Sequence, residues 1–522
     1  MVLYLLFLIV LLGAALYVSY RRLYLSPISH IPGPKLAAVT RLYEAYYDLW
    51  LGGQYTFKII ALHKEYGPII RISPWEIHVA DPDFYEVVYA SSASGHRRDK
   101  YDWFTKSFGL DNAVFATPGH DLHRLRRSAL APYFSMTSAR RLQPLLQERV
   151  DKLLERFEGF RNTGEVLNTS WAYAAFTNDV VMTYCFARHD NRLEAPDFDP
   201  SYRDASYFGS TAGNYLKHAP WVNNFMQSLP NSIAELLHPA MASFVAQKRD
   251  VLAHIQSITS GHNASHEDLS HPTIFHTILD CKLPDREKRD ERLSDDAQVL
   301  TMAGTLTTAW VLEVTTFHLL SNPSILRLLK AELSTAIPSA NDIGTIPLPA
   351  LESLPYLNAV IKEGLRLTYG VSCRLARIDP DNTIPFTDKA TGKTYAIPPG
   401  TPIGMTSVQI HHDESLFPDS WTFRPERWLG PDAKALEKYM VSFTAGSRQC
   451  LGINLAYCEL YLAMSAVWRV WGSREVRGVD DVGFFELWET GKEDVEIQSD
   501  AFLPIVRKGS QGIRVKAFGK GE

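Results

Sequence analysis

The stretch Phe443-Thr-Ala-Gly-Ser-Arg-Gln-Cys-Leu-Gly452 holds a single cysteine, Cys450, with one glycine before it, one after it and an arginine two residues upstream. The apolar run from Ile453 to Trp471 that follows is predicted to be helical. The glycines allow the backbone to approach a bulky group, and a helix N-terminus favours a thiolate over a thiol. Because zinc and iron–sulfur sites need several clustered ligands, one thiolate indicates haem iron. The alternative is a buried cysteine in a glycine-containing turn.

This stretch resembles the haem-binding signature of the cytochrome P-450 superfamily, F-x-x-G-x-R-x-C-x-G. The fixed positions are met by Phe443, Gly446, Arg448, Cys450 and Gly452. The resemblance implies that Cys450 is the axial thiolate ligand of haem b, that Phe443 packs beside the sulfur, and that Arg448 pairs with a haem propionate. A thiolate ligand pushes electron density onto the iron and favours O–O cleavage.

Two further motifs agree with this resemblance. A predicted helix carries Glu363 and Arg366, whose spacing places them on one face. At a surface such a pair stabilises by only about 0.3–0.5 kcal/mol, which is the alternative interpretation. In the family, E-x-x-R is buried and is completed by an arginine of an F-x-P-E-R-(F/W) segment, which this chain matches at residues 423–428. By resemblance, Glu363, Arg366 and Arg427 form a structural network that locks the Cys450 loop.

Residues Ser294 to Ser321 are predicted to form one long helix with Ser294 as its N-cap. Its centre, residues 303–308, contains a glycine and three threonines. Glycine costs a helix about 1 kcal/mol relative to alanine, and threonines can bend a helix by bonding to preceding carbonyls. A close crossing with another helix is one explanation of this composition.

The family offers a second explanation, because its motif A-G-x-(D/E)-T-(T/S) lies over the distal face of the haem. The resemblance implies that Gly304 opens a groove for dioxygen, and that Thr307, with Thr308 beside it, helps deliver protons during oxygen activation. Leu306 stands where the family has its acid. Proton delivery would then depend on Thr307, Thr308, water or hydroxyl groups of the substrate, or the chemistry would need no second proton.

The predicted helix from His120 to Arg127 is rich in arginine, and a solvated basic face is the simple interpretation. The family carries W-x-x-x-R here, with both side chains at a haem propionate. In this chain His123 replaces the tryptophan and Arg127 keeps the arginine, and both can donate to a carboxylate. Arg377 matches a further propionate-binding position of the family, with Arg374 as the runner-up.

The segment 101–115 is rich in aromatic residues, namely Trp103, Phe104, Phe108 and Phe115. Ordinary core packing is one interpretation of these residues. In the family, the corresponding loop roofs the substrate pocket. The resemblance also implies that Ala303 and Val371 face the substrate.

Residues Val2 to Val18 are apolar and uncharged, and at about 1.5 Å per residue they are near the short end of a bilayer span. Arg21 and Arg22 follow, so we expect the N-terminus to face the lumen and the remainder the cytosol. A cleaved signal peptide is the alternative. The prolines that come next predict a semi-rigid spacer. The sequence therefore predicts a transmembrane anchor at 1–20, a basic and proline-rich hinge at 21–40, and a haem-thiolate catalytic domain at 41–522.

Charge and cysteine content indicate which kinds of protein this chain is not. The 53 Lys and Arg against 58 Asp and Glu give a formal net charge of −5, which is no footprint for nucleic acid binding. Five scattered cysteines argue against a disulfide framework and for a reducing compartment. Residues 68–72 and 76–80 are predicted as two short strands of a small β-rich lobe.

We therefore expect a mainly α fold with a smaller β-region, the cytochrome P-450 fold, anchored by one helix in the endoplasmic reticulum membrane. The expected enzyme is a monooxygenase that inserts one oxygen atom of O₂ into a lipophilic substrate, with the hard chemistry supplied by haem. Electrons are expected from NADPH through a separate flavoprotein reductase, with cytochrome b5 as a further donor. The chain looks most like the microsomal enzymes of filamentous-fungal secondary metabolism, which favours a terpenoid, polyketide or alkaloid substrate. A haem-thiolate isomerase or dehydratase that needs no reductase, and a haem-binding protein without catalysis, are the alternatives.

Overall fold

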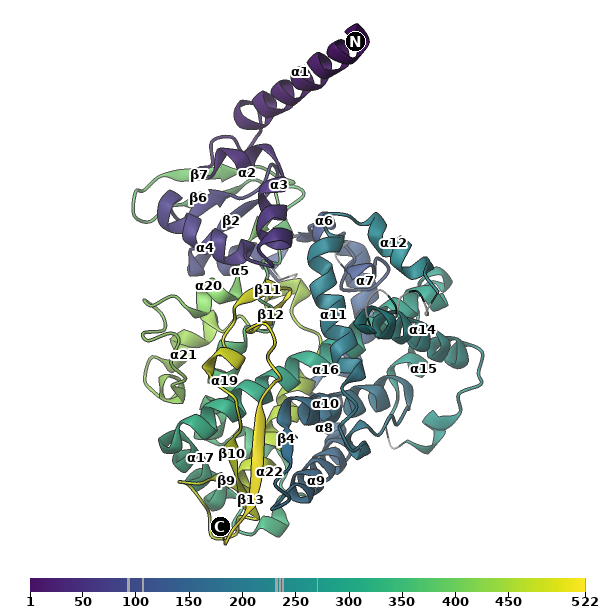
Figure 1. The fold of residues 1–522 in the computed structure, drawn as a ribbon, viewed down its shortest axis with the longest axis vertical. Coiled ribbons are helices and arrows are strands. Elements are labelled where there is room, and N and C mark those ends of the chain that lie inside the picture. The colour runs from purple at the N-terminus through teal and green to yellow at the C-terminus, as the bar shows by residue number, and fades with distance from the viewer. Residues whose placement is uncertain are drawn as a thin grey trace.

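The computed structural model describes residues 1–522 apart from 92–93, 106–107, 231–232, 234–235, 237–238, 270 and 522. A mostly helical body is joined to a smaller lobe of strands and short helices, from which one helix projects (Figure 1). The predicted mainly α fold with a smaller β-region is confirmed.

The α-helices are α1 (Val2–Tyr24), α2 (Lys35–Val39), α3 (Leu42–Ala45), α4 (Tyr55–Tyr66), α5 (Tyr85–Val88), α6 (Asp102–Thr105), α7 (His120–Leu130), α8 (Met136–Arg141), α9 (Gln143–Gly159), α10 (Thr169–Phe186), α11 (Ser201–Leu216), α12 (Trp221–Ser228), α14 (Pro239–Thr259), α15 (Ile274–Ile278), α16 (Asp290–Ser321), α17 (Pro323–Ala336), α18 (Leu348–Glu352), α19 (Pro355–Thr368), α20 (Ser407–His411), α21 (Ala433–Leu436) and α22 (Ile453–Val470).

The strands are β1 (Ile69–Arg71), β2 (Ile77–Val79), β3 (Asp99–Lys100), β4 (Val166–Asn168), β5 (Arg377–Ile378), β6 (Ile384–Thr387), β7 (Thr394–Ile397), β8 (Ile403–Gly404), β9 (Trp471–Ser473), β10 (Gly483–Leu487), β11 (Ser499–Ala501), β12 (Leu503–Ile505) and β13 (Arg514–Gly519).

The core of the helical body is built where α10, α16, α19 and α22 pack together. Every residue of α10 is buried except Trp171, which is typical of a helix that neighbouring elements surround. The longest helix, α16, packs against α10, α14, α19 and α22. This central position means that α16 is held by neighbouring helices on several sides.

Helix α16 begins at Asp290, so the prediction that Ser294 is its N-cap is wrong. Arg289 occupies the N-cap position with extended backbone, and Asp290 and Glu291 bring negative charge to the first turn. Acidic side chains stabilise that end of a helix through its dipole. They allow the helix to start one turn before Ser294.

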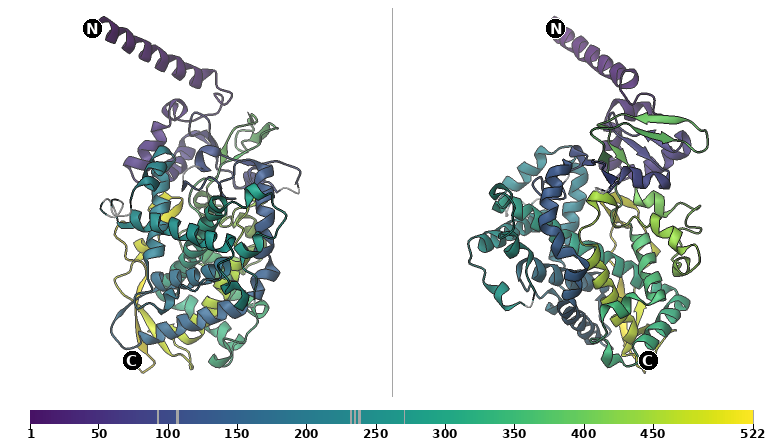
Figure 2. Two further views of the ribbon diagram at one scale, coloured as in Figure 1. Left: turned by 90° about the vertical axis from the view of Figure 1, so that its right-hand side faces the viewer. Right: turned by 180° about the vertical axis from the view of Figure 1, so that it is seen from behind.

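The smaller lobe contains a five-stranded sheet of order β1-β2-β8-β5-β3. Strands β1 and β2 are antiparallel, with Ile70 opposite His78, and they are the two short strands that the sequence predicted. Strands β5 and β8 come from the segment after α19, so this sheet joins the N-terminal part of the chain to the region of Arg377. A second sheet of order β4-β13-β10-β9 lies near the C-terminus, at the end of the body away from α1 (Figure 2).

Helix α1 stands outside the body, and none of its residues is buried (Figure 2). It is long and apolar enough to cross a membrane, and it continues to Tyr24, beyond the anchor expected at 1–20. The proline-rich segment after it packs on the lobe, because Ile28 is buried and the Arg71 N–H donates to the Pro32 carbonyl at 2.6 Å. The Arg22 guanidinium also stacks over the ring of Trp75, at 4.8 Å from its centroid. The end of α1 is thus fastened to the lobe.

Candidate functional site

The loop that carries Cys450 lies immediately before α22 and is folded tightly against the smaller lobe. The Cys450 N–H donates to the Phe443 carbonyl at 2.9 Å, which closes the loop. Gly446 has a φ of +75°, and a Cβ at this position would overlap the carbonyl oxygens of Tyr89 and Ala90. Only glycine meets both conditions without strain.

Cys450 is exposed, whereas the other four cysteines are buried or half-buried. A buried core cysteine, the alternative interpretation from the sequence, therefore does not describe Cys450. Desolvation by the surrounding protein raises the pKa of its thiol, while the Gly452 N–H and the charge of Arg127 act to lower it. The last two groups favour the thiolate that a metal ion would bind.

The Glu363–Arg366 pair of α19 is fully buried and is joined by two hydrogen bonds from the guanidinium, of 2.9 and 2.8 Å. The same carboxylate accepts from Arg427 at 3.0 Å and from the Trp428 indole N–H at 2.9 Å. Burial alone would raise the pKa of Glu363, but Arg366 and Arg427 hold it below its ordinary value. A solvated surface pair is therefore not the arrangement found.

This network reaches the cysteine loop through two residues just before it. The Arg366 guanidinium donates to the His411 carbonyl at 2.8 Å, and His411 Nε2 accepts from the Val441 N–H at 3.1 Å. The Ser442 hydroxyl donates to the Leu365 carbonyl at 2.7 Å. The start of the loop is thus fixed to α19.

Five basic side chains gather beside the loop: Lys100, His123, Arg127, Arg377 and Arg448. Burial, together with the charges of the other four, lowers the pKa of His123 to about 2. Burial and the charge of Arg377 lower the pKa of Arg448 to about 9. Burial also places the pKa of Lys100 well below its ordinary value. Like charges in a desolvated site are unfavourable unless an anion balances them.

Among the described residues, the Asp99 carboxylate acts to raise the pKa of Arg448. This carboxylate already accepts a hydrogen bond from the backbone N–H of His120. Arg448 donates to the Thr117 carbonyl at 2.7 Å, and Arg377 likewise donates to a backbone carbonyl at 2.8 Å. Neutral carbonyls thus take guanidinium N–H groups that an anion would bind more strongly. The cluster and the exposed Cys450 thiol fit a haem, which brings a metal ion and two propionates.

Lys100 was not identified from the sequence, where it is an isolated lysine with no motif around it. Its ammonium lies 3.1 Å from the centroid of the Phe115 ring and donates to the Phe115 carbonyl at 2.7 Å. Arg374, the runner-up to Arg377, lies elsewhere. It pairs with Glu44 at 2.7 Å and Glu76 at 2.8 Å, so the Nε and Nη2 groups of its guanidinium are already engaged.

The centre of α16 has an open side at Ala303, which is exposed, and Thr307, which is half-buried. The Thr307 hydroxyl donates to the Ala303 carbonyl at 2.9 Å, a bond that bends helices. Gly304 faces α10, because a Cβ there would lie 2.9 Å from Cγ2 of Val181. The glycine therefore permits a close crossing of α10 and α16, which is the alternative that the sequence left open.

Leu306 is buried, with 4% of its surface exposed. A carboxyl group contacts this part of α16 from another helix, since Glu459 of α22 is hydrogen-bonded to Thr308. Burial raises the pKa of Glu459 to about 8. The sequence signal that could have revealed it is a lone acid in the apolar run of residues 453–471.

Phe104, Phe108 and Phe115 lie together in edge-to-face contacts, and Phe502 completes the cluster. The rings of Phe108 and Phe502 are 4.8 Å apart. Phe502 comes from the turn between β11 and β12, where it has a φ of +70°. Val371 is half-buried and packs against the same part of the smaller lobe as Phe104 and Phe502. We call these four phenylalanines the aromatic cluster.

Trp103 lies apart from the aromatic cluster. The Arg41 guanidinium stacks on its ring at 4.2 Å, and the His218 ring meets it edge-on at 5.5 Å. Arg41 also lies 4.5 Å from the Trp75 ring, so it is held between two indoles. Trp103 thus belongs to the junction between α11 and the smaller lobe.

Comparison with known proteins extends these observations to nearly the whole chain. A family model described as "Cytochrome P450" matches residues 39–471. The cytochrome P450 monooxygenase tpcC of Cochliobolus heterostrophus is 49% identical over 500 residues, which cover 96% of this chain and 94% of the relative. The cytochrome P450 monooxygenase astB of Talaromyces wortmannii is 42% identical over 502 residues, with 95% and 94% covered. The tryptophan 6-hydroxylase fscE of Fusarium equiseti is 38% identical over 499 residues, with 95% and 93% covered.

Proposed function

The chain belongs to the cytochrome P450 family, and we propose that it is a membrane-anchored monooxygenase that inserts one oxygen atom of O₂ into a lipophilic secondary metabolite. The observation that carries the proposal is the exposed residue Cys450 beside a cluster of buried and half-buried basic side chains whose charges lower one another's pKa values. Haem, once bound there, supplies the binding and reductive activation of O₂, which side chains do not provide.

The residues of the chain hold and orient that group. Cys450 Sγ would bind the iron from a loop that α19 makes rigid, and a rigid support is what a metal ligand needs. Arg448 would donate to a propionate in place of the neutral carbonyls that it bonds here, and Arg127 would also donate to a propionate. On α16, the Thr307 hydroxyl could hold a proton and pass it on, because a hydroxyl donates and accepts at once. Leu306 offers no proton at the adjacent position.

We further propose that α1 anchors the protein in the endoplasmic reticulum membrane with the catalytic domain on the cytosolic side. The basic pair Arg21 and Arg22 at the end of α1 supports this orientation. An NADPH-dependent flavoprotein reductase would supply electrons one at a time, and cytochrome b5 would be a second donor. The reductase would dock on the side of the body that carries Cys450.

A lipophilic substrate is supported by the aromatic cluster, because small-molecule sites are lined mainly by apolar and aromatic side chains. Terpenoids, polyketides and alkaloids all belong to this class. One relative is named for hydroxylating tryptophan, which makes indole compounds the first alkaloid-type candidates to test on this chain.

The reduced-CO difference spectrum of the wild type and Cys450→Ala tests the central assignment. We expect a thiolate-type Soret band in the wild type and its loss in the variant, because alanine offers no ligand atom. A wild type without this band refutes the assignment. Product formation that needs both NADPH and O₂ then separates a monooxygenase from a haem-thiolate isomerase or dehydratase, which would turn over without either.

A further inference from the structure

Lys100 is a buried lysine on β3, beside Arg377 on the neighbouring strand β5. Burial and the charges of Arg377 and Arg448 place its pKa well below its ordinary value, and no carboxylate of the described residues acts against them. An ammonium has three N–H groups, and one of them donates to the Phe115 carbonyl at 2.7 Å. A buried ammonium is unfavourable unless an anion pairs with it.

The buried cations close to Lys100 do have such partners. Arg98, two residues earlier in the chain, lies 2.6 Å from a carboxylate oxygen of Asp379. Arg126 of α7 lies 2.7 Å from a carboxylate oxygen of Glu287. Acids are therefore placed opposite the buried arginines on both sides of Lys100, whereas Lys100 itself faces other cations.

Asp99 does not supply the missing charge. Successive residues of a strand point to opposite faces, so the side chains of Asp99 and Lys100 diverge. The Asp99 carboxylate accepts a hydrogen bond from the His120 N–H at 2.7 Å and acts to raise the pKa of Arg448. Its charge is thus directed to Arg448.

Haem alone would leave the basic cluster with an excess of positive charge. His123 is neutral at physiological pH, because its pKa is about 2. The remaining side chains of the cluster are the four cations Lys100, Arg127, Arg377 and Arg448. Ferric iron, the porphyrin ring and a cysteine thiolate cancel one another in charge, so the two propionates and Asp99 would balance three of the four cations. One further anion is needed.

Lys100 is the cation of the cluster that meets the aromatic rings. Its ammonium lies 3.1 Å from the centroid of the Phe115 ring and 5.8 Å from that of Phe104. Arg127 lies at the other end of the cluster, where its charge acts on Cys450. The four rings of the aromatic cluster are half-buried, so each has surface left for a further contact. A positive charge thus borders an apolar surface.

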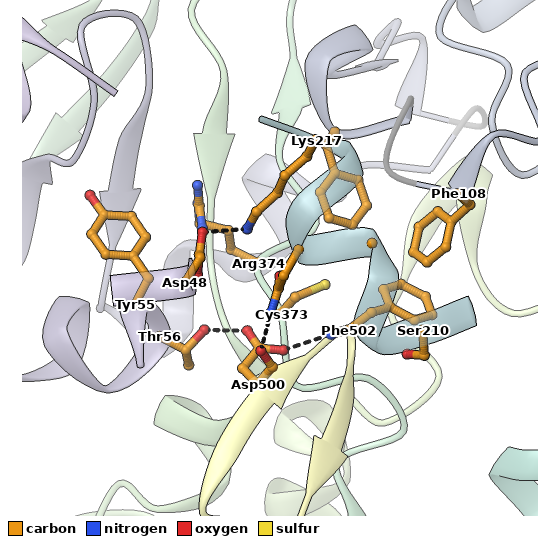
Figure 3. Close-up of a pocket in the computed structure, with 13 residues that line it drawn as sticks. Asp48, Tyr55, Thr56, Phe108, Ser210, Lys217, Cys373, Arg374, Asp500 and Phe502 are labelled. Atoms are coloured by element: carbon orange, nitrogen blue, oxygen red, sulfur yellow. Dashed lines mark hydrogen bonds and ion pairs between the residues drawn. The ribbon is translucent and has the colours of Figure 1, made fainter. Parts of the chain in front are cut away.

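Beyond the aromatic cluster, the charged groups are paired within the protein (Figure 3). Three of the four rings line a cavity there whose open space is about 20 Å³, which is room for about one water molecule. The ammonium of Lys217 lies 2.7 Å from Asp48, and His218 Nε2 lies 3.2 Å from the same Asp48 oxygen. An anionic group in contact with the rings would therefore find its counter-charge at Lys100.

We propose that Lys100 binds the carboxylate of the substrate, which makes the substrate class an amphiphile with an apolar or aromatic skeleton and one carboxylate. The rings of the aromatic cluster would contact the skeleton, since small-molecule sites combine apolar walls with a few polar groups. A haem propionate has the same chemistry as this carboxylate, so the experiment must separate the two sources. The proposal rests on the proposed function, because it names the substrate of that same site.

The test uses ω-(imidazol-1-yl)alkanoic acids of increasing chain length, each compared with its primary amide. The imidazole binds the ferric iron in both compounds, so each affinity follows from the shift of the Soret band of the haem-loaded full chain in lipid nanodiscs. At chain lengths that reach Lys100, we expect the acid to bind about 10- to 150-fold more tightly than the amide, the range that one hydrogen bond to a charged group gives.

Lys100→Met should abolish the preference for the acid. Lys100→Arg should keep most of it, because arginine is also a cation that donates to carboxylates. Lys152→Met is the matched control and should keep the full preference, since Lys152 pairs with a 67% exposed glutamate on α9. A preference for the acid that persists in Lys100→Met would overturn the proposal.

The rate of haem transfer to apomyoglobin separates the two sources of the carboxylate. We expect Lys100→Met to leave this rate unchanged, because the haem would lose no partner. A rate that rises as much as in Arg448→Leu would assign Lys100 to a propionate and overturn the proposal. Equal affinities of acid and amide at every chain length in the wild type would overturn it without any variant. A wild type without the thiolate-type Soret band would instead count against the proposed function.

Discussion

Glu459 allows a quantitative test of how strongly burial shifts the pKa of a carboxyl group in this part of the protein. Its side chain lies between α22 and α16, with 3% of its surface exposed, and its carboxyl group is hydrogen-bonded to Thr308. Burial raises its pKa from an ordinary 4.5 to about 8. The folded protein therefore binds this proton more tightly than the unfolded chain does.

The linkage between proton binding and folding sets the size and sign of the effect. Stability from this group is complete below its unfolded pKa of 4.5 and is lost as the pH rises through the folded pKa of about 8. Each pKa unit is worth about 1.36 kcal/mol. The difference, 8 − 4.5 = 3.5 units, therefore amounts to a loss of about 5 kcal/mol of unfolding free energy between about pH 4 and pH 9.

The variant Glu459→Gln keeps the shape and the hydrogen bond to Thr308 but has no proton to release. We expect the stability of the variant relative to wild type to rise by about 5 kcal/mol from about pH 4 to pH 9, measured by urea unfolding of the haem-loaded protein. Glu155→Gln, at a 67% exposed position, is the control and should stay parallel to wild type. Parallel curves for wild type and Glu459→Gln across this range would refute the reasoning, because the carboxyl group would then have an ordinary pKa.

Three other changes test the rest of the site. Glu363→Gln leaves Arg366 and Arg427 buried without a full counter-charge and should lower the unfolding free energy by about 3–5 kcal/mol in denaturant titrations; a loss below about 1 kcal/mol would mean that the network is not needed. Arg448→Leu should speed haem transfer to apomyoglobin by about 10- to 150-fold, since a hydrogen bond to a charged group is worth about 1.5–3 kcal/mol, and an unchanged rate would remove Arg448 from the propionate site. Leu306→Asp should lower the peroxide released per NADPH consumed, because it adds a proton-holding group beside Thr307; an unchanged ratio would show that the leucine does not limit proton delivery.

The side of the site that carries Cys450 could be predicted because its chemistry is local in sequence. Gly446, Arg448 and Cys450 lie within one loop, and Glu363 and Arg366 lie on one turn of α19. Residues that depend on contacts between distant segments could not be found in this way. Lys100 and Phe502 carry no motif, and only strand pairing and the β11–β12 turn bring them to the site. The start of α16 was misjudged because acidic residues upstream compete with Ser294 for the first turn.

The same distinction between local motifs and distant contacts applies to the buried ion pair of Lys217 and Asp48. Lys217 and Asp48 are far apart in the sequence, where each would be interpreted as a solvated surface charge. Neither their positions nor the net charge of −5 indicates that they are buried together. A buried charge without its partner is unfavourable, so substitution at either position should be tolerated only when the other changes as well. Relatives without a basic residue at the position of Lys217 should therefore also lack the acid at the position of Asp48. Relatives that keep the acid opposite an apolar residue would contradict this expectation, because Asp48 would then need only His218.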